Sequence, residues 1–216
     1  RKRIMPNIID KTYFQNANEL NIPLAKEFIV ANPALETPNS SDYLTSLCEK
    51  IEKSILVNAL GLQTYNTLQL ALADIENPLY ASYKKLVQGD EYDNKIWIGL
   101  DNEYSLIAWR IFEQFLFTTN EQLSGIGAVN VNTQGASLVT PAYKIASANS
   151  NFLQGYQNGF LHFPMIYNDG EFIDWYGCST DVNVSLYQYL NDKATDFPNV
   201  DLQNFKIYES QNSFGI

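Results

Sequence analysis

A run of apolar side chains between residues 106 and 117 restricts the fold more than any other feature of this sequence. The pattern predicts a long helix over 101–119, with Asp101 as its N-cap. Its apolar positions are Leu106, Ile107, Trp109, Ile111, Phe112, Phe115, Leu116 and Phe117. These residues cover most of the helix circumference, so the helix must be buried on nearly every side. It is therefore expected to be the central helix of a bundle, or to be covered partly by other subunits.

Apolar residues at helical spacing predict further helices on both sides of this segment. The expected ranges are 42–60, 62–75, 78–87, 141–162 and 182–190. Gly61 is expected to end the first of them, because glycine is the usual residue just beyond a helix. Pro78 is typical of a first helical position, and Gly89 is expected beyond the end of that helix.

Three shorter stretches carry turn or strand signals. Residues 88–93 are expected to form a turn, and residues 124–134 a loop or short strand. Asp169-Gly170 stands between apolar runs at 163–167 and 171–176, which predicts a β-hairpin. The last stretch, 197–216, is expected to be extended, with a strand-like part at 204–209.

Together these elements predict a mainly α protein. We expect a small helical bundle with an extended N-terminal arm and a mixed α/β C-terminal extension that contains the hairpin. The boundaries are an arm at 1–40, a helical body at 41–162, and a hairpin, short helix and extended tail at 163–216. Four prolines interrupt the arm, and 216 residues suit one domain with an extension.

The composition excludes some classes of function. The formal net charge is -10 and the pI is about 4.5. Gripping a nucleic-acid backbone needs a basic face, so DNA or RNA binding is not expected as the main activity. Aromatic residues reach 13% while charged residues reach only 18%. Such a surface suits contact with other proteins. No apolar run reaches 18 residues, so no membrane span is expected.

The residues that usually carry chemistry do not form a recognisable site. His162 is the single histidine, and a zinc site or a histidine-based triad needs more partners. Cys48 lies on an apolar stripe and is expected to be a buried thiol, and Cys178 has no metal-ligand spacing from it. Gly125-Ile126-Gly127 lacks the strand and third glycine of a dinucleotide-binding loop.

Two acidic groups offer the remaining candidates. Glu49 and Glu52 are expected on a solvated helix face, opposite the apolar stripe. Asp90, Glu91 and Asp93 are expected in a polar turn, and they lack the spacing of a calcium loop. We therefore expect no enzymatic activity, no cofactor and no metal.

Several segments of the helical body resemble helical head–tail connector or neck-ring proteins of tailed bacteriophages, including crAss-like and related phages of Bacteroides-type hosts. The order and spacing are similar over about residues 13–127. The matching pieces are Tyr13-Phe14, Leu20-Asn21-Ile22-Pro23, Ile51, Ser54-Ile55-Leu56, Leu60-Gly61, Thr64-Tyr65, Leu86, Gly89, Tyr92, Trp97-Ile98-Gly99-Leu100, Ser105-Leu106-Ile107-Ala108, Ile111-Phe112, Phe115-Leu116 and Ser124-Gly125-Ile126-Gly127.

The resemblance implies a virion structural protein that joins the portal to the tail. Such a subunit would form a homo-oligomeric ring of about twelve copies and contact neighbouring portal, neck or tail proteins. DNA would pass through the ring without specific binding, and assembly would take place in the host cytoplasm. Residues beyond about 163 have no counterpart in this resemblance.

Two other classes of function stay open. One is a tail or baseplate adaptor, or a carbohydrate-binding module, since aromatic and amide side chains suit sugar contacts. Carbohydrate-binding modules, however, are usually all-β. The other is a polysaccharide hydrolase, which would need two carboxylates facing each other across a cleft.

Two groups of residues are candidates for the assembly function. Expected core or subunit-interface residues are Trp97, Gly99, Leu100, Phe112, Leu116, Tyr65 and Gly61. Expected residues of inter-subunit arms are Tyr13, Phe14, Ile22, Phe205, Ile207 and Phe214. For Trp97 two interpretations stay open: a plug at the end of the bundle, or an anchor on a neighbouring subunit.

Overall fold

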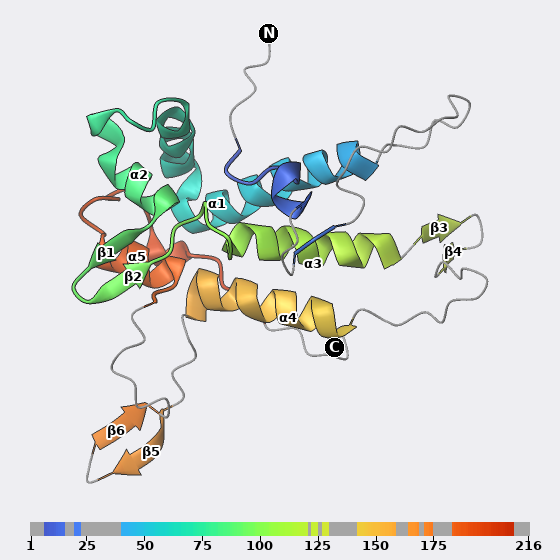
Figure 1. Cartoon of the computed structure of the whole chain (residues 1–216). Coiled ribbons are helices and arrows are strands. Elements are labelled where there is room, and N and C mark those ends of the chain that lie inside the picture. Colours follow the sequence, from blue (N-terminus) through green and yellow to red (C-terminus); the bar gives the residue numbers. More distant parts are fainter. Residues whose placement is uncertain are drawn as a thin grey trace.

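The computed structural model describes residues 7–15, 20–22, 40–120, 122–124, 127–129, 142–158, 164–168, 171–174 and 183–209. This part of the chain is mainly α-helical with small antiparallel hairpins, which confirms the predicted fold class (Figure 1). The helices are α1 (Ser40–Ala73), α2 (Ala81–Gln88), α3 (Leu106–Asn120), α4 (Ala142–Leu153) and α5 (Leu186–Asp192). The strands pair as β1 (Asp90–Tyr92) with β2 (Lys95–Trp97), β3 (Gln122–Ser124) with β4 (Gly127–Val129), and β5 (Pro164–Asn168) with β6 (Glu171–Asp174).

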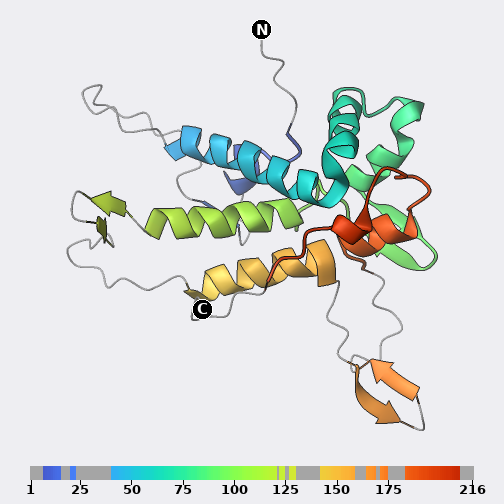
Figure 2. The ribbon, with the colours of Figure 1, turned by 180° about the vertical axis from the view of Figure 1, so that it is seen from behind.

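Helix α1 consists of two helical halves that meet at Gly61. This glycine has φ 75° and ψ 160°, a conformation outside the helical region that residues other than glycine rarely adopt. The predicted break between helices 42–60 and 62–75 is therefore confirmed, although the second half ends at Ala73. Figures 1 and 2 show the second half turned away from the first and lying near α2.

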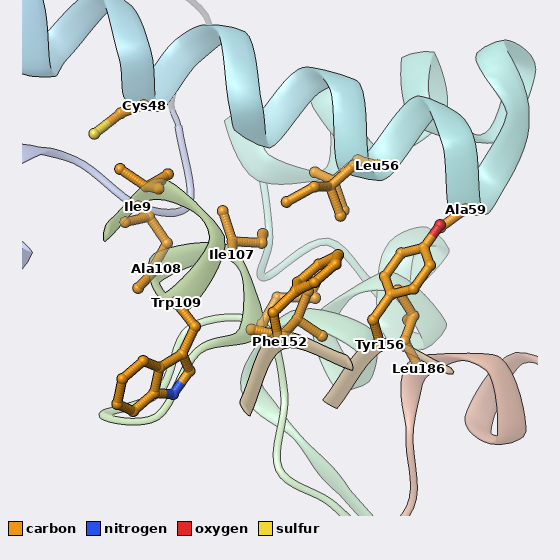
Figure 3. Close-up of a cluster of buried hydrophobic side chains, with 14 of the residues drawn as sticks. Ile9, Cys48, Leu56, Ala59, Ile107, Ala108, Trp109, Phe152, Tyr156 and Leu186 are labelled. Carbon is orange, nitrogen blue, oxygen red and sulfur yellow. The ribbon is translucent and has the colours of Figure 1, made fainter. Parts of the chain in front are cut away.

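Helix α3 lies between α1 and α4 and is the central helix of the body, as predicted (Figures 1 and 2). Phe112 is buried in the core, and Leu116 is partly buried against it. Apolar side chains of all three helices meet in this core, together with Ile9 of the N-terminal segment and Leu186 of α5 (Figure 3). Tyr65, on the second half of α1, also packs partly buried against this core.

The predicted start of the central helix at residue 101 is wrong, because α3 begins at Leu106. Residues 101–104 form a turn instead. In this turn Asn102 accepts a hydrogen bond from the Tyr104 backbone N–H at 2.7 Å and donates one to the Gly99 carbonyl at 2.6 Å. An asparagine that bonds neighbouring backbone groups competes with the helix and delays its start.

The segment 88–93, expected to be a turn, instead holds the last residue of α2 and strand β1, and only Asp93 lies in a turn. Strand β1 pairs with β2 in the register Asp90–Trp97, with Asp93 and Asn94 between the strands. Both loop residues have positive φ, 46° and 59°, as a two-residue loop between twisted strands requires. Asp and Asn tolerate this conformation, and the sequence analysis did not take this pair as a hairpin signal.

Trp97 is buried at the end of this hairpin and stacks on Tyr189 with ring centroids 5.3 Å apart. Its indole N–H donates to the Leu86 carbonyl at 2.8 Å. Of the two interpretations, the structure therefore supports the plug. Gly99 has φ 88°, and a Cβ there would lie 2.6 Å from the Val87 carbonyl oxygen, so only glycine fits. Leu100, also in the core, donates its backbone N–H to the same Val87 oxygen at 2.8 Å.

The second half of the chain follows the predictions in part. The expected hairpin strands pair as β5 with β6, with Asn168 opposite Glu171, while Asp169 and Gly170 lie outside the described residues. In the first half, the short helix Pro78–Tyr80 (η2), which begins with proline, and α2 follow the predicted 78–87 closely, with Asn77 as the N-cap of η2. Strand β4 lies within the stretch expected to be a loop or short strand.

Three predicted boundaries in this half are wrong. Helix α4 ends at Leu153 rather than 162, and a π-helical turn, Gln154–Asn158, follows it. Helix α5 begins at Leu186, because the Ser185 side chain caps it by accepting from the Gln188 backbone N–H at 3.3 Å. No strand forms at 204–209: a 3₁₀ turn, Leu202–Asn204 (η4), is followed by residues 205–209 without regular secondary structure.

The residues expected to reach neighbouring subunits lie mostly in the chain's own core. Phe14, in the 3₁₀ helix Lys11–Gln15 (η1), is buried with Ile22, and Phe205 is buried at the other end. Assigning these three residues to inter-subunit arms was therefore wrong, because each of them is buried against the helical body of its own chain. Tyr13 is partly buried and donates through its hydroxyl to the Asn102 carbonyl at 2.8 Å. Ile207 is exposed.

Phe214 lies outside the described residues. So do Arg1-Lys2-Arg3 and the prolines of the predicted arm. Among the residues that the structure describes, no helix has both the length and the apolar character needed to cross a bilayer.

Candidate functional site

Glu52, expected on a solvated face of α1, is instead 2% exposed. Its carboxylate accepts hydrogen bonds from the backbone N–H groups of Ile8, at 3.0 and 3.1 Å, and Ile9, at 2.9 Å. It thus holds the N-terminal segment against α1. Burial raises the pKa of Glu52 to about 7, although the two backbone N–H donors oppose this shift. The missed signal was its spacing of four residues from both Cys48 and Leu56, which are buried.

A second buried carboxylate, Glu113, joins α3 to α4. Arg110 donates to one of its oxygens at 2.5 Å and Asn149 to the other at 3.2 Å. Burial raises the pKa of Glu113, and the nearby Arg110 guanidinium opposes that rise. The guanidinium also lies over the rings of Phe152 and Tyr208, at 5.1 and 5.3 Å. This group is satisfied within the chain and connects elements of the core.

Asp90, the first residue of the acidic stretch 90–93, is paired with cationic side chains of the same chain. Asp90 lies within 3.2 Å of the Lys85 ammonium and 3.6 Å of that of Lys193. The Tyr189 hydroxyl donates to it at 3.4 Å. Nowhere in the described residues do three His, Cys, Asp or Glu side chains gather closely enough to hold a metal ion. Asp90 therefore forms ionic contacts that join strand β1 to Lys85 of α2 and to Lys193 at the end of α5.

The other residues considered for chemistry do not meet. Cys48 is buried as predicted, and burial raises the pKa of its thiol to about 12, so the thiol stays protonated near neutral pH. Glu49 is exposed while its expected companion Glu52 is buried. His162 and Cys178 lie outside the described residues, and of the glycine pair only Gly127 is described, as the first residue of β4.

Exposed leucines mark one end of the molecule. Leu62 and Leu70, on the second half of α1, are 61% and 55% exposed, and Leu79 on η2 is 86% exposed. Leu62 and Leu70 are eight residues apart and so lie on one face of the helix. Asp74 and Glu76, both exposed, follow the C-terminal end of α1. We call these five residues the leucine surface.

A hollow of about 330 Å³ lies between α3 and α4. It is lined by Trp109, Phe112, Tyr143, Lys144 and Ser147, which we call the tyrosine hollow. Tyr143 is 83% exposed, and Lys144 is exposed beside it. In Figure 3 the Trp109 ring extends from α3 away from α1. Neither surface was predicted, although Phe112 was among the candidate core or interface residues.

The two surfaces lie at opposite ends of the body. The leucine surface is on the second half of α1 and on η2, beside α2, whereas the tyrosine hollow is at the start of α4 (Figures 1 and 2). Comparisons with protein-family models, curated proteins and solved structures found no match for this chain.

Proposed function

We propose that this protein is a ring-forming structural subunit of the neck of a tailed bacteriophage, where it joins the portal to the tail. One observation carries the proposal: a single chain exposes two different surfaces at opposite ends, the leucine surface and the tyrosine hollow. Subunits that associate through two different surfaces form head-to-tail contacts, and these generate a ring when the rotation closes. A ring around a channel is what a neck subunit must provide.

The charge of the chain is compatible with this role. With a formal net charge of -10, the protein repels the phosphate backbone rather than gripping it. Genomic DNA could then slide through the channel without specific binding. The assignment to a phage particle comes from the resemblance over residues 13–127.

The alternative functions that the sequence left open are supported to different degrees. The mainly helical fold disfavours a carbohydrate-binding module, since such modules are usually all-β. A tail or baseplate adaptor would use the same two surfaces, and differs from a neck ring only in its place in the particle. A non-enzymatic role remains our prediction.

Imaging of the virion whose genome encodes this chain tests the proposal. Cryo-electron microscopy should find the chain as a closed ring between portal and tail, with the leucine surface of each copy near its neighbour. Density for the chain in the baseplate would favour the adaptor. Absence of the chain from purified virions would overturn the proposal.

A further inference from the structure

We propose that the leucine surface of one copy docks onto the tyrosine hollow of the next, with Lys144 facing Asp74 and Glu76. This inference rests on the proposed ring, and it names the two surfaces that meet in each contact. In this contact the hollow of each copy is occupied by the leucine surface of a second copy of the chain.

The two surfaces are complementary in shape. The leucines protrude, with more than half of each side chain exposed. The tyrosine hollow has a volume of about 330 Å³ and is lined chiefly by aromatic rings. That volume is at the lower end of the roughly 300–1,000 Å³ of concave sites that enclose a ligand. Leucine side chains inserted among these rings would bury apolar area on both partners.

The two surfaces are also complementary in charge. Asp74 and Glu76 follow the C-terminal end of α1, whose last turn holds no basic residue. Lys144 stands in the first turn of α4, which holds no acidic residue. Helix dipoles favour cations at the C-terminal end and anions at the N-terminal end. Each of these two helix ends therefore carries a charge of the sign that the dipole of its own helix disfavours.

Contacts among the described residues offset these charges only in part. Lys84 pairs with Glu76 at 2.6 Å. Asp74 accepts a hydrogen bond from Asn77 at 3.0 Å, and no ion pair among the described residues includes Asp74 or Lys144. Docking Lys144 of one copy beside Asp74 of the next would supply both helix ends with the opposite charge. This complementarity is the reason for choosing a second copy as the occupant.

Cysteine cross-linking tests which surfaces meet. Leu79→Cys and Tyr143→Cys are made separately, each with Cys178→Ser. Cys48 is retained because it is buried and its thiol stays protonated. The two proteins are mixed at the highest soluble concentration and treated with a short bismaleimide. We expect a covalent dimer in the mixture and none in either protein alone.

Charge reversal tests the electrostatic part of the contact. Lys144→Glu should weaken self-association at least about tenfold, measured by sedimentation velocity, and adding Asp74→Lys should restore it. Lys53→Glu is the matched control, since Lys53 is exposed on the first half of α1 and the charge change is the same. The control should associate as the unaltered chain does.

The outcomes separate this inference from the proposed ring. A covalent dimer of Leu79→Cys alone indicates a two-fold contact and overturns head-to-tail docking. Absence of the mixed dimer overturns it as well, and so does self-association that Lys144→Glu leaves unchanged. If virion images nevertheless show the chain in a neck ring, the proposed function stands and only the choice of surfaces is wrong. Absence from the virion overturns the proposed function, whatever the cross-links show.

Discussion

Gln157 and Tyr208 form a reciprocal pair of hydrogen bonds between a side chain and the backbone. The Gln157 amide donates to the Tyr208 carbonyl at 2.7 Å, and the Tyr208 N–H donates back to Gln157 Oε1 at 2.8 Å. The side-chain amide thus bonds both the N–H and the carbonyl of one residue, as the backbone of a neighbouring strand would. The pair fastens the C-terminal segment to the π-helical turn after α4, and Asn58 of α1 donates to the Tyr208 hydroxyl at 2.9 Å.

Gln157→Ala should lower the free energy of unfolding by about 1–3 kcal/mol. The change leaves the Tyr208 N–H and carbonyl without their partner in a partly buried site. Chemical denaturation monitored by circular dichroism measures the effect. Gln63→Ala is the control, because Gln63 is an exposed residue of α1. Equal midpoints for the two variants would contradict the importance of the pair.

Trp97→Ala should destabilise the chain by roughly 3–5 kcal/mol, because it removes a buried ring that stacks on Tyr189. Trp97→Phe keeps a ring but leaves the Leu86 carbonyl without its 2.8 Å donor, so a smaller loss is expected. Thermal unfolding of both variants tests the order. A near-normal midpoint for Trp97→Ala would refute the plug assignment.

Gly99→Ala should destabilise more than Gly61→Ala. Both glycines have positive φ, 88° and 75°, and an alanine in such a conformation costs about 1–3 kcal/mol. At Gly61 a Cβ would meet no atom within 4 Å, whereas at Gly99 it would lie 2.6 Å from the Val87 carbonyl oxygen. The extra clash sets the order. Denaturant titrations of the two variants measure it, and the reverse order would show that the loop at Gly99 relaxes freely.

The buried Glu52 carboxyl should make stability fall as pH rises. Burial raises its folded-state pKa from 4.5 to about 7, so between these values the folded chain binds a proton that the unfolded chain has lost. Stability from this group is complete below about pH 4.5 and is lost as pH rises through 7, by about 3 kcal/mol in total.

The unfolding free energy of the unaltered chain minus that of Glu52→Gln isolates the contribution of Glu52. Subtracting the two curves of unfolding free energy against pH removes groups common to both, including Glu113 and His162. Glu49→Gln, at an exposed position of the same helix, should leave the slope unchanged. A difference curve that rises with pH would mean that the Ile8 and Ile9 N–H donors outweigh burial.

The sequence alone determined those elements that are specified by residues close together in the chain. The apolar surface of 106–117 indicated a central helix, Asp169-Gly170 indicated a hairpin, and Gly61 marked the break in α1. Each signal concerns residues within a few positions of one another. Because backbone preference and burial periodicity act over that range, they are readable without the fold.

Tertiary structure decided what depends on residues far apart in the chain. Glu52 is buried because Ile8 and Ile9, more than forty positions away, lie against it. Phe14 and Phe205 are buried by their own chain, and an apolar pattern predicts burial without telling whether the same chain or a neighbour provides it. The candidate assembly surfaces follow the same logic: Leu62, Leu70, Leu79 and Tyr143 are exposed only because packing of the other apolar residues left them outside. Which apolar side chains stay exposed depends on how the whole core packs, so a local sequence pattern does not predict it.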